Sequence, residues 1–245
     1  MEDFSKNSFL KAEKLTKSFG GLMALCELNF EIFEGEIFGV IGPNGSGKTT
    51  LFNVMTGFLK ANSGKLFFME EEITGLPPHQ ICRKGIARIF QLVKPFAQLT
   101  VLTNVMVGGM YGRNPASRMR QAKERSREIL NFVGLGNKIE VTASQLTMAE
   151  RKRLELARAL AAQPQLLLLD ELMAGLNQAE TEIAMELVKK IRDSGITVIM
   201  VEHIMKAVLG ISDRIIVLNA GEKIAEGSPK EVVNNQQVIE AYLGK

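Results

Sequence analysis

Short apolar runs alternate with longer amphipathic segments over most of the chain. An apolar run bounded by turn residues predicts a buried strand, and apolar residues three or four positions apart predict a helix. Because helices cover both faces of a parallel sheet, this alternation predicts an α/β protein with a mainly parallel sheet. The predicted strands are 37–41, 86–90, 166–169, 197–201 and 214–218, and helices are predicted at 50–55, 79–84, 179–192 and 204–209.

The N-terminal part of the chain has a pattern of its own. Two strand-like segments, 10–15 and 25–32, flank the turn residues Gly20-Gly21, which predicts an antiparallel hairpin. A further strand is predicted at 65–69. We expect these strands to form a small antiparallel β subdomain beside the parallel core.

From 101 to 162 the spacing of apolar residues is helical, and glycines separate the helices. The predicted helices are 101–110, 117–133 and 148–162. These helices form an insert that interrupts the α/β alternation. We therefore interpret 1–245 as a single domain, in which 1–91 and 163–245 form the α/β core with its β subdomain and 92–162 form a helical subdomain.

Composition narrows the function classes without selecting one. The net charge of the 245-residue chain is +3, so overall charge does not point to nucleic acid. Cys26 and Cys82 lie far apart and are interpreted as buried, reduced thiols of a cytosolic protein. The first residues, Met1 to Phe4, lack the basic and apolar regions of a signal peptide. No apolar run approaches the roughly 20 residues of a membrane span, so any span must come from another chain.

A glycine-rich loop lies between the predicted strand 37–41 and the predicted helix 50–55. Its G-x-x-x-x-G-K-T pattern, in this strand–loop–helix context, predicts a phosphate-binding P-loop rather than a plain glycine turn. Glycines let backbone N–H groups converge on an anion, and the helix N-terminus adds a positive partial charge. Lys48 would reach the β- and γ-phosphates, and the Thr49 hydroxyl would bind Mg²⁺. The loop consists of Gly42, Pro43, Asn44, Gly45, Ser46, Gly47, Lys48 and Thr49.

Two carboxylates, Asp170 and Glu171, follow the apolar run 166–169. They are expected at the carboxyl end of a buried strand, the edge at which open α/β sheets bind ligands. Asp170 would hold Mg²⁺ directly or through water, and Glu171 would orient and deprotonate an attacking water. An ordinary acidic turn is the alternative, but a P-loop in the same chain favours the functional interpretation.

Two further polar residues follow predicted strands at the same edge. His203 follows 197–201, and although a lone histidine is more often a helix cap or a core residue, this topology directs it at the γ-phosphate. Gln91 follows 86–90, and its amide can contact Mg²⁺ or the attacking water. Without that context Gln91 would be an ordinary surface glutamine.

Two other polar segments have sufficient structural explanations. Thr147 and Glu150 form the spacing of a capping box before a helix, although an exposed helix N-terminus can also bind an anion. A basic cluster is interpreted first as a solvated helix face, then as a phospholipid surface, and last as a nucleic-acid surface. The cluster consists of Arg113, Arg118, Arg120, Lys123, Arg125 and Arg127, with Glu124 among them.

The order of these motifs from Leu10 to Leu243 resembles the ATP-binding subunit of an ABC transporter. Residues 85–91 and 239–244 are most similar to the ATPases of branched-chain (hydrophobic) amino-acid importers. The resemblance implies a P-loop NTPase core with a helical insert, and ATP and Mg²⁺ as cofactors. It also implies an ATP-hydrolysing subunit that powers a membrane transporter.

The resemblance also assigns roles by position. Phe19 matches the aromatic residue that stacks on adenine, and Gly42 to Thr50 match the phosphate loop. Asp170, with Thr49 and Gln91, matches the Mg²⁺ site. Glu171, His203, Gln91 and Lys48 match the catalytic positions. Residues 146–150 lie where the family has its L-S-G-G-Q signature, so Thr147 and Ala149 would contact a nucleotide held by another subunit.

The family's assembly implies the partners of this chain. Such domains dimerise head to tail with a second ATP-binding subunit, as a homodimer or a heterodimer, and ATP lies between the P-loop of one and the signature of the other. A separate transmembrane permease would dock on 94–100, and a substrate-binding protein would act indirectly. The chain would then be cytoplasmic and peripheral on the cytoplasmic face of the cell membrane, with no nucleic-acid partner.

Three departures from the family pattern matter. Met148 and Ala149 replace both signature glycines, so their side chains should hinder close approach to a phosphate. Leu172 replaces the proline after the catalytic glutamate, and Asn177 replaces the aspartate of the loop that crosses to the partner. Because a signature completes the partner's site, a heterodimer with an intact partner should have a competent site at Lys48 and a weaker opposite site.

Two other function classes remain open at this point. A soluble ABC ATPase acting on DNA or ribosomes usually has two nucleotide domains or a long coiled-coil insertion. This chain has one P-loop, and the segment from Gln91 to Thr147 is too short for that insertion. A weakly hydrolysing regulatory module is suggested by Met148 and Ala149, whereas an intact Glu171 and His203 argue against it.

Overall fold

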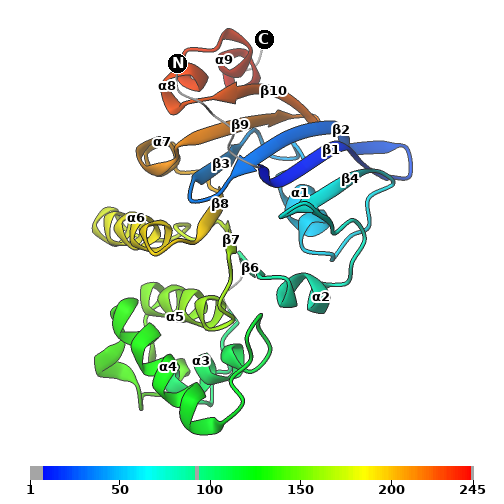
Figure 1. Cartoon of the computed structure of the whole chain (residues 1–245). Helices are drawn as coiled ribbons and strands as arrows, with labels where there is room; N and C mark the ends of the chain where they lie inside the picture. Colours follow the sequence, from blue (N-terminus) through cyan, green and yellow to red (C-terminus); the bar gives the residue numbers. More distant parts are fainter. Residues whose placement is uncertain (1–7, 92–93, 244–245) are drawn as a thin grey trace, which may run out of the picture.

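In the computed structural model, which describes residues 8–91 and 94–243, two β-sheets lie beside a group of helices (Figure 1). The larger sheet has the strand order β10-β9-β3-β8-β7-β6. The strand at one edge of this sheet, β10 (Glu222–Gly227), runs antiparallel to β9. The other strands are parallel, which confirms the predicted α/β class. They are β3 (Ile37–Ile41), β6 (Ile86–Ile89), β7 (Leu166–Asp170), β8 (Thr197–Val201) and β9 (Arg214–Asn219).

The register of the parallel strands brings their carboxyl ends to one edge. Ile41 of β3 pairs with Val217 of β9, and Asp170 of β7 pairs with Val201 of β8. Every residue of β3, β7 and β8 is buried, as expected for strands covered on both faces. The segments after β3, β7 and β8 therefore leave the sheet side by side, at the edge where such sheets bind ligands.

The smaller sheet is antiparallel, with the order β2-β1-β4-β5. The predicted hairpin is present, and its strands β1 (Ser8–Phe19) and β2 (Leu22–Phe33) meet at a turn of two glycines. Both strands are longer than predicted, because backbone pairing continues toward the turn through polar residues such as Lys17 and Ser18. The sheet is completed by β4 (Ser63–Phe68) and β5 (Glu71–Glu72).

Helices cover both faces of the larger sheet. The helix α1 (Lys48–Met55) lies between the two sheets, where Phe52 shares one buried core with Phe38 of β3 (Figure 1). The helices α6 (Gln178–Asp193) and α7 (Met205–Ile211) belong to the core on the opposite face. The remaining helices of this part are α2 (Pro78–Arg83), α8 (Pro229–Val233) and α9 (Gln236–Leu243).

The predicted insert forms a separate layer of helices beyond β6 (Figure 1). Its helices α3 (Val101–Gly109), α4 (Met119–Phe132) and α5 (Met148–Ala161) pack around fully buried aliphatic side chains. The backbones of α3 and α5 approach closely at Gly108, where an added Cβ would lie 2.4 Å from the carbonyl oxygen of Arg158. Short 3₁₀ turns, η1 (Gly136–Lys138) and η2 (Ala143–Gln145), join α4 to α5. The division of the chain at 92 and 162 stays a prediction.

Several element boundaries differ from the predictions. The helix predicted from residue 50 begins at Lys48, because the P-loop leads directly into its first turn. The helix predicted from residue 117 begins at Met119, because Arg118 has an extended backbone. The strand predicted to end at Met69 ends one residue earlier, because Met69 has a positive φ of 50°. The elements after residue 219 were not predicted.

Some predictions concern residues outside the described ranges. These are the absence of a signal peptide at Met1 to Phe4, the start of the helical subdomain at residues 92 and 93, and the resemblance carried by Gly244. Within residues 8–91 and 94–243, no helix is long and apolar enough to cross a membrane.

Candidate functional site

The glycine loop connects β3 to α1, and its backbone requires glycine at two positions. Gly42 has φ 151°, and an added Cβ would lie 2.0 Å from the carbonyl oxygen of Leu218. Gly47 has φ 106°, and an added Cβ would lie 2.4 Å from the carbonyl oxygen of Ala24. The backbone at Leu218 and Ala24 therefore packs directly against the loop. This packing holds the backbone N–H groups of the loop at the N-terminus of α1.

Lys48 is buried in the first turn of α1 and folds back onto the loop. Its ammonium group donates hydrogen bonds to the carbonyl oxygens of Gly42 (2.8 Å) and Pro43 (2.9 Å). Burial lowers the pKa of Lys48, and the negative charges of Glu171 and Asp170 act in the opposite direction. The next residue, Thr49, is exposed at the start of the same helix. The loop thus presents a cation and a hydroxyl at one helix N-terminus.

Asp170, the last residue of β7, forms a buried ion pair. Its Oδ2 atom lies 2.6 Å from Nη2 of Arg88, and the two side chains are 6% and 5% exposed. Arg88 lies on the neighbouring strand β6 and also donates to Oδ1 of Asn53 on α1, at 2.7 Å. Sequence reasoning missed Arg88, although a charged residue inside a predicted buried strand was an available signal.

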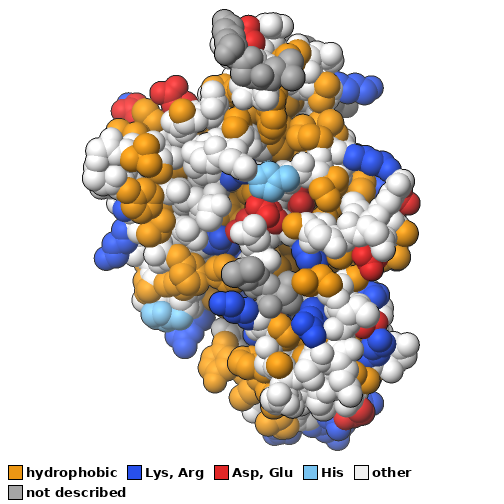
Figure 2. Space-filling model, turned by 180° about the vertical axis from the view of Figure 1, so that it is seen from behind, with side chains coloured by type: hydrophobic (Ala, Val, Ile, Leu, Met, Phe, Trp, Pro, Cys, Tyr) orange, Lys and Arg blue, Asp and Glu red, His pale blue; other side chains and the backbone are white. Residues whose placement is uncertain are grey.

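Glu171 brings together three of the residues predicted for the site. Its Oε2 accepts a hydrogen bond from Nε2 of Gln91 at 2.7 Å, and its Oε1 lies 2.8 Å from Nε2 of His203. Glu171 also has a positive φ of 53°, an unusual conformation for a side chain of this size. Figure 2 shows a histidine and acidic side chains in contact on one face, with basic side chains around them.

A second layer of charged residues lies behind this turn. Lys152 of α5 is buried, and its ammonium donates to the carbonyl oxygens of Leu172 (2.7 Å) and Glu171 (3.1 Å). Glu202, at the end of β8, accepts the N–H of Met173 at 2.7 Å. Burial raises the pKa of Glu202 to about 7. Sequence reasoning missed both charged residues, because neither belongs to a motif with a known spacing.

Thr49, Gln91 and Asp170 line one cavity of about 700 Å³. Hydroxyl, amide and carboxylate oxygens are ligands that Mg²⁺ prefers, so the donor set fits this ion. Among the described residues, no group of three or more His, Cys, Asp or Glu could hold a metal ion. Mg²⁺ commonly binds through one or two carboxylates together with substrate phosphates, which is the arrangement that this donor set fits.

The segment in the place of the signature lies in the helical layer, away from α1 (Figure 1). Thr147 caps α5: its hydroxyl accepts the N–H of Glu150, and its own N–H donates to the Glu150 carboxylate. This confirms the predicted capping box. Met148, in the first turn, is 57% exposed. Thr147 and Ala149 are therefore not assembled with the glycine loop within this chain.

Three further positions that the sequence singles out have defined surroundings in the structure. Phe19, at the end of β1, has an exposed ring with Nζ of Lys17 at 5.2 Å from its centre. Asn177 caps α6 in a second capping box, and Leu172 is buried. In the basic cluster, Arg120 forms an exposed ion pair with Glu124, which supports a solvated helix face.

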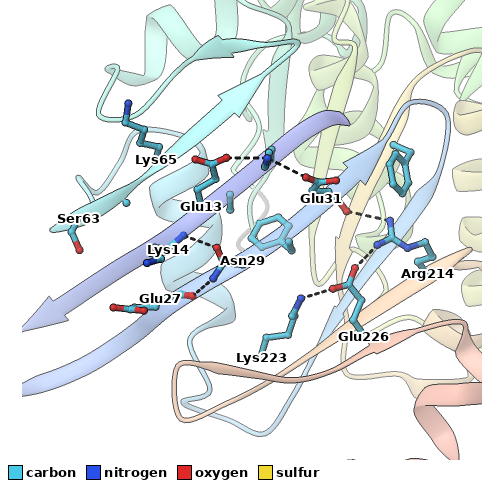
Figure 3. Close-up of a pocket in the computed structure, with 15 residues that line it drawn as sticks. Glu13, Lys14, Glu27, Asn29, Glu31, Ser63, Lys65, Arg214, Lys223 and Glu226 are labelled. Atoms are coloured by element: carbon cyan, nitrogen blue, oxygen red, sulfur yellow. Dashed lines mark hydrogen bonds and ion pairs between the residues drawn. The ribbon is translucent and has the colours of Figure 1, made fainter. Parts of the chain in front are cut away.

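A second open cleft, of about 820 Å³, lies between the smaller sheet and the β9–β10 hairpin (Figure 3). Six of the charged residues that line it pair with one another: Lys11 with Glu13 and Glu31, and Glu226 with both Arg214 and Lys223. None of the residues predicted for the site lines it. The chemistry is therefore concentrated at the edge formed by the ends of β3, β6, β7 and β8.

Known proteins are similar to this chain in sequence and in fold. The ABC transporter family model matches residues 25–174, and a model described as branched-chain amino acid ATP-binding cassette transporter matches 222–245. The chain is 40% identical to the high-affinity branched-chain amino acid transport ATP-binding protein LivG of Escherichia coli K12, over 96% of this chain and 98% of that protein.

Solved structures agree with this match. The ADP conformation of an ATP-binding cassette of an ABC transporter superposes with a TM-score of 0.89 at 32% identity, over 98% of this chain and all of that chain. A dimeric post-hydrolysis state of another such cassette, bound to ADP and phosphate, gives a TM-score of 0.80 at 28% identity, over 90% and 98% of the chains.

Proposed function

The chain belongs to the ABC transporter family, and we propose that it hydrolyses ATP to power the import of branched-chain or other amino acids through a separate permease. The observation that carries the proposal is the pair of contacts that holds both carboxylate oxygens of Glu171, one to Gln91 and one to His203. This carboxylate lies at the sheet edge that also carries the glycine loop and Asp170. The similarity to LivG supports an amino-acid importer.

The nucleotide would bind with its phosphates in the loop from Gly42 to Thr50. Lys48 would exchange its hydrogen bonds to loop carbonyls for contacts to the β- and γ-phosphates. The exposed ring of Phe19 would stack on the adenine. Mg²⁺, when bound, would be held by Thr49, Asp170 and Gln91 and would supply positive charge to the phosphates.

Glu171 would act as the general base. Its carboxylate would accept a proton from the attacking water, and the hydroxide would displace ADP from the γ-phosphorus. Contacts from Gln91 and His203 fix the carboxylate, and they would keep it aligned while the water attacks. His203 would also contact the γ-phosphate as its charge shifts.

A second ATP-binding subunit would complete the site. The capped N-terminus of α5, with Thr147 and Ala149, lies in the helical layer, away from the glycine loop of its own chain (Figure 1). It would therefore contact a nucleotide held by another chain. The side chains of Met148 and Ala149 occupy positions at which glycine would let a phosphate approach. The dimer would therefore be asymmetric if its partner carried an intact signature.

The permease would dock on the cavity that also contains the site. Away from Asp170 the cavity is lined by exposed aromatic side chains, and Tyr111 is 71% exposed. Phe58 and Phe90, whose rings stack edge to face, line it as well. Lys94, the first residue of the predicted docking segment 94–100, lines it too. Docking there would place the chain on the cytoplasmic face of the membrane.

The proposal is tested by purification of the full assembly. The tagged chain is expressed in its natural host, extracted in detergent and isolated with its partners, which are then identified by mass spectrometry. We expect a permease and a second ATPase, and ATP turnover in proteoliposomes that rises with an amino acid and its binding protein. Recovery of the chain without a membrane protein would favour a soluble ATPase. Recovery with a permease but without ATP turnover would favour a regulatory module.

A further inference from the structure

Arg88 is a buried cation at the carboxylate predicted to serve the metal. Its Nη2 atom lies 2.6 Å from Oδ2 of Asp170, and its Nη1 atom donates to Asn53 at 2.7 Å. The rings of Phe52 and Phe90 lie 5.5 and 4.6 Å from its guanidinium carbon. The position of this guanidinium is therefore fixed by α1, by Asp170 and by two aromatic rings.

The hydrogen bonding of Arg88 is incomplete. Its Nε atom is buried and has no partner in the described part of the chain. Its Nη1 atom donates to Asn53 and, at 3.4 Å, to Thr56, but the unpaired Nε is costly, so these bonds alone do not account for an arginine here. Its charge is balanced by the ion pair with Asp170, which in turn supplies the counter-charge that a buried carboxylate needs.

A divalent cation at Asp170 would meet this positive charge. Two cations on one buried carboxylate repel each other, and burial of both side chains reduces the screening by solvent. We propose that Arg88 is a positioning residue that neutralises Asp170 in the metal-free chain and lowers its affinity for Mg²⁺. The inference rests on the proposed function, because it takes Asp170 as a residue of the metal site.

If Arg88 has this role, Mg²⁺ binds at Asp170 only together with a nucleotide or after it. Mg²⁺ alone would have to compete with Arg88, whereas Mg²⁺ carried by nucleotide phosphates has additional ligands. Removal of the charge of Arg88 should therefore lower the Mg²⁺ concentration at which Mg²⁺ affects nucleotide binding. If the role of Arg88 were purely structural, its removal would change stability and leave that concentration unchanged.

The test compares Arg88→Gln with Arg88→Lys in the purified full-length chain. Glutamine removes the charge and keeps an amide that can donate to Asp170, whereas lysine keeps the charge. A fluorescent ADP analogue is titrated with Mg²⁺, and the concentration that gives half of the Mg²⁺-dependent change is measured. We expect that concentration to fall about tenfold for Arg88→Gln and to stay within about twofold of wild type for Arg88→Lys.

Two control variants separate charge from general damage. Arg214→Gln removes another arginine that lies over two phenylalanine rings and pairs with a buried glutamate, Glu36, and it should leave the Mg²⁺ titration unchanged. Asp170→Asn removes the carboxylate, so adding Arg88→Gln to it should no longer change the titration. An effect of Arg88→Gln that persists in Asp170→Asn would overturn the inference.

The remaining outcomes also decide. An unchanged Mg²⁺ titration in Arg88→Gln overturns the inference and leaves the proposed function standing, because wild type still binds the nucleotide. If wild type binds no nucleotide with or without Mg²⁺, both are overturned. If Arg88→Gln unfolds, refolding by Mg²⁺ with ADP but not by ADP alone supports the inference, and equal refolding by both contradicts it.

Discussion

The Nε2 atom of His203 lies 2.8 Å from Oε1 of Glu171. An ionised carboxylate only accepts hydrogen bonds, so Nε2 must carry the proton when Glu171 is charged. The other carboxylate oxygen accepts from Gln91, which leaves the remaining lone pairs of Glu171 for a water. Residues from the ends of β6, β7 and β8 thus fix one carboxylate between two donors.

Substitution of Glu171 by Gln should abolish hydrolysis and keep nucleotide binding. The amide preserves the volume but cannot accept a proton, so turnover of the complete assembly should fall by about 10²- to 10⁴-fold. Phosphate release and ADP affinity are measured in parallel. Turnover equal to that of wild type would exclude Glu171 as the base. Loss of both activities would point to a folding defect, which circular dichroism would reveal.

Lys152 should contribute strongly to stability because it ties α5 to the turn at Glu171. Lys152→Met would leave two carbonyl oxygens without their donor and would remove the positive charge that lowers the pKa of the buried Glu202. We expect a loss of about 3 kcal/mol in the free energy of unfolding, measured with urea. Lys152→Arg, which keeps the charge, should lose less. Equal losses for the two variants would show that Lys152 stabilises the fold through its packing and not through its charge.

Glu202 should make stability depend on pH. Its folded-state pKa of about 7 lies above the ordinary value of 4.5, so the unfolded chain releases this proton first as pH rises. Protonated Glu202 therefore stabilises the folded chain fully below about pH 4.5, and this stabilisation is lost as the pH rises through about 7.

Glu202→Gln removes this titration and keeps an oxygen to accept the N–H of Met173. Relative to wild type, the variant should gain up to about 3 kcal/mol between about pH 5 and about pH 8. Urea unfolding of both proteins at the two pH values measures the difference. A constant difference would contradict the raised pKa of Glu202, since the other titrating groups are common to both proteins.

The parts of the fold that were predictable carry strong local signals. Apolar strands such as β7 and the glycine loop of Gly42 are recognisable from a few consecutive residues. The β10 strand was missed because its residues are mostly polar and half-exposed, so no apolar run marks it. Helix α9 was missed because a short amphipathic segment near a chain end gives a weak periodicity.

The candidate site divides in the same way. Glu171, Gln91 and His203 follow predicted strands, and parallel topology alone was enough to expect them at one edge. Arg88 and Lys152 reach the site from the middle of a strand and a helix. Only the packing of β6 against β7, and of α5 against the turn after β7, brings them there. Their roles were therefore not available from spacing.

Met148 and Ala149 should limit hydrolysis at the nucleotide held by the partner subunit. Met148 is exposed at the N-terminus of α5, where an anion would approach backbone N–H groups. The double variant Met148→Gly, Ala149→Gly removes both side chains, so turnover of the full assembly should rise by about tenfold at the partner's site, corresponding to one recovered contact. The double variant is measured in assemblies in which this chain also carries Glu171→Gln, so that the remaining turnover comes from the partner's site.

Glycine in the first helical turn costs about 1 kcal/mol of stability, and Arg120→Gly on the exposed helix α4 controls for that loss. Turnover that does not rise, in a variant as stable as its control, would mean that these side chains already leave room for the phosphate.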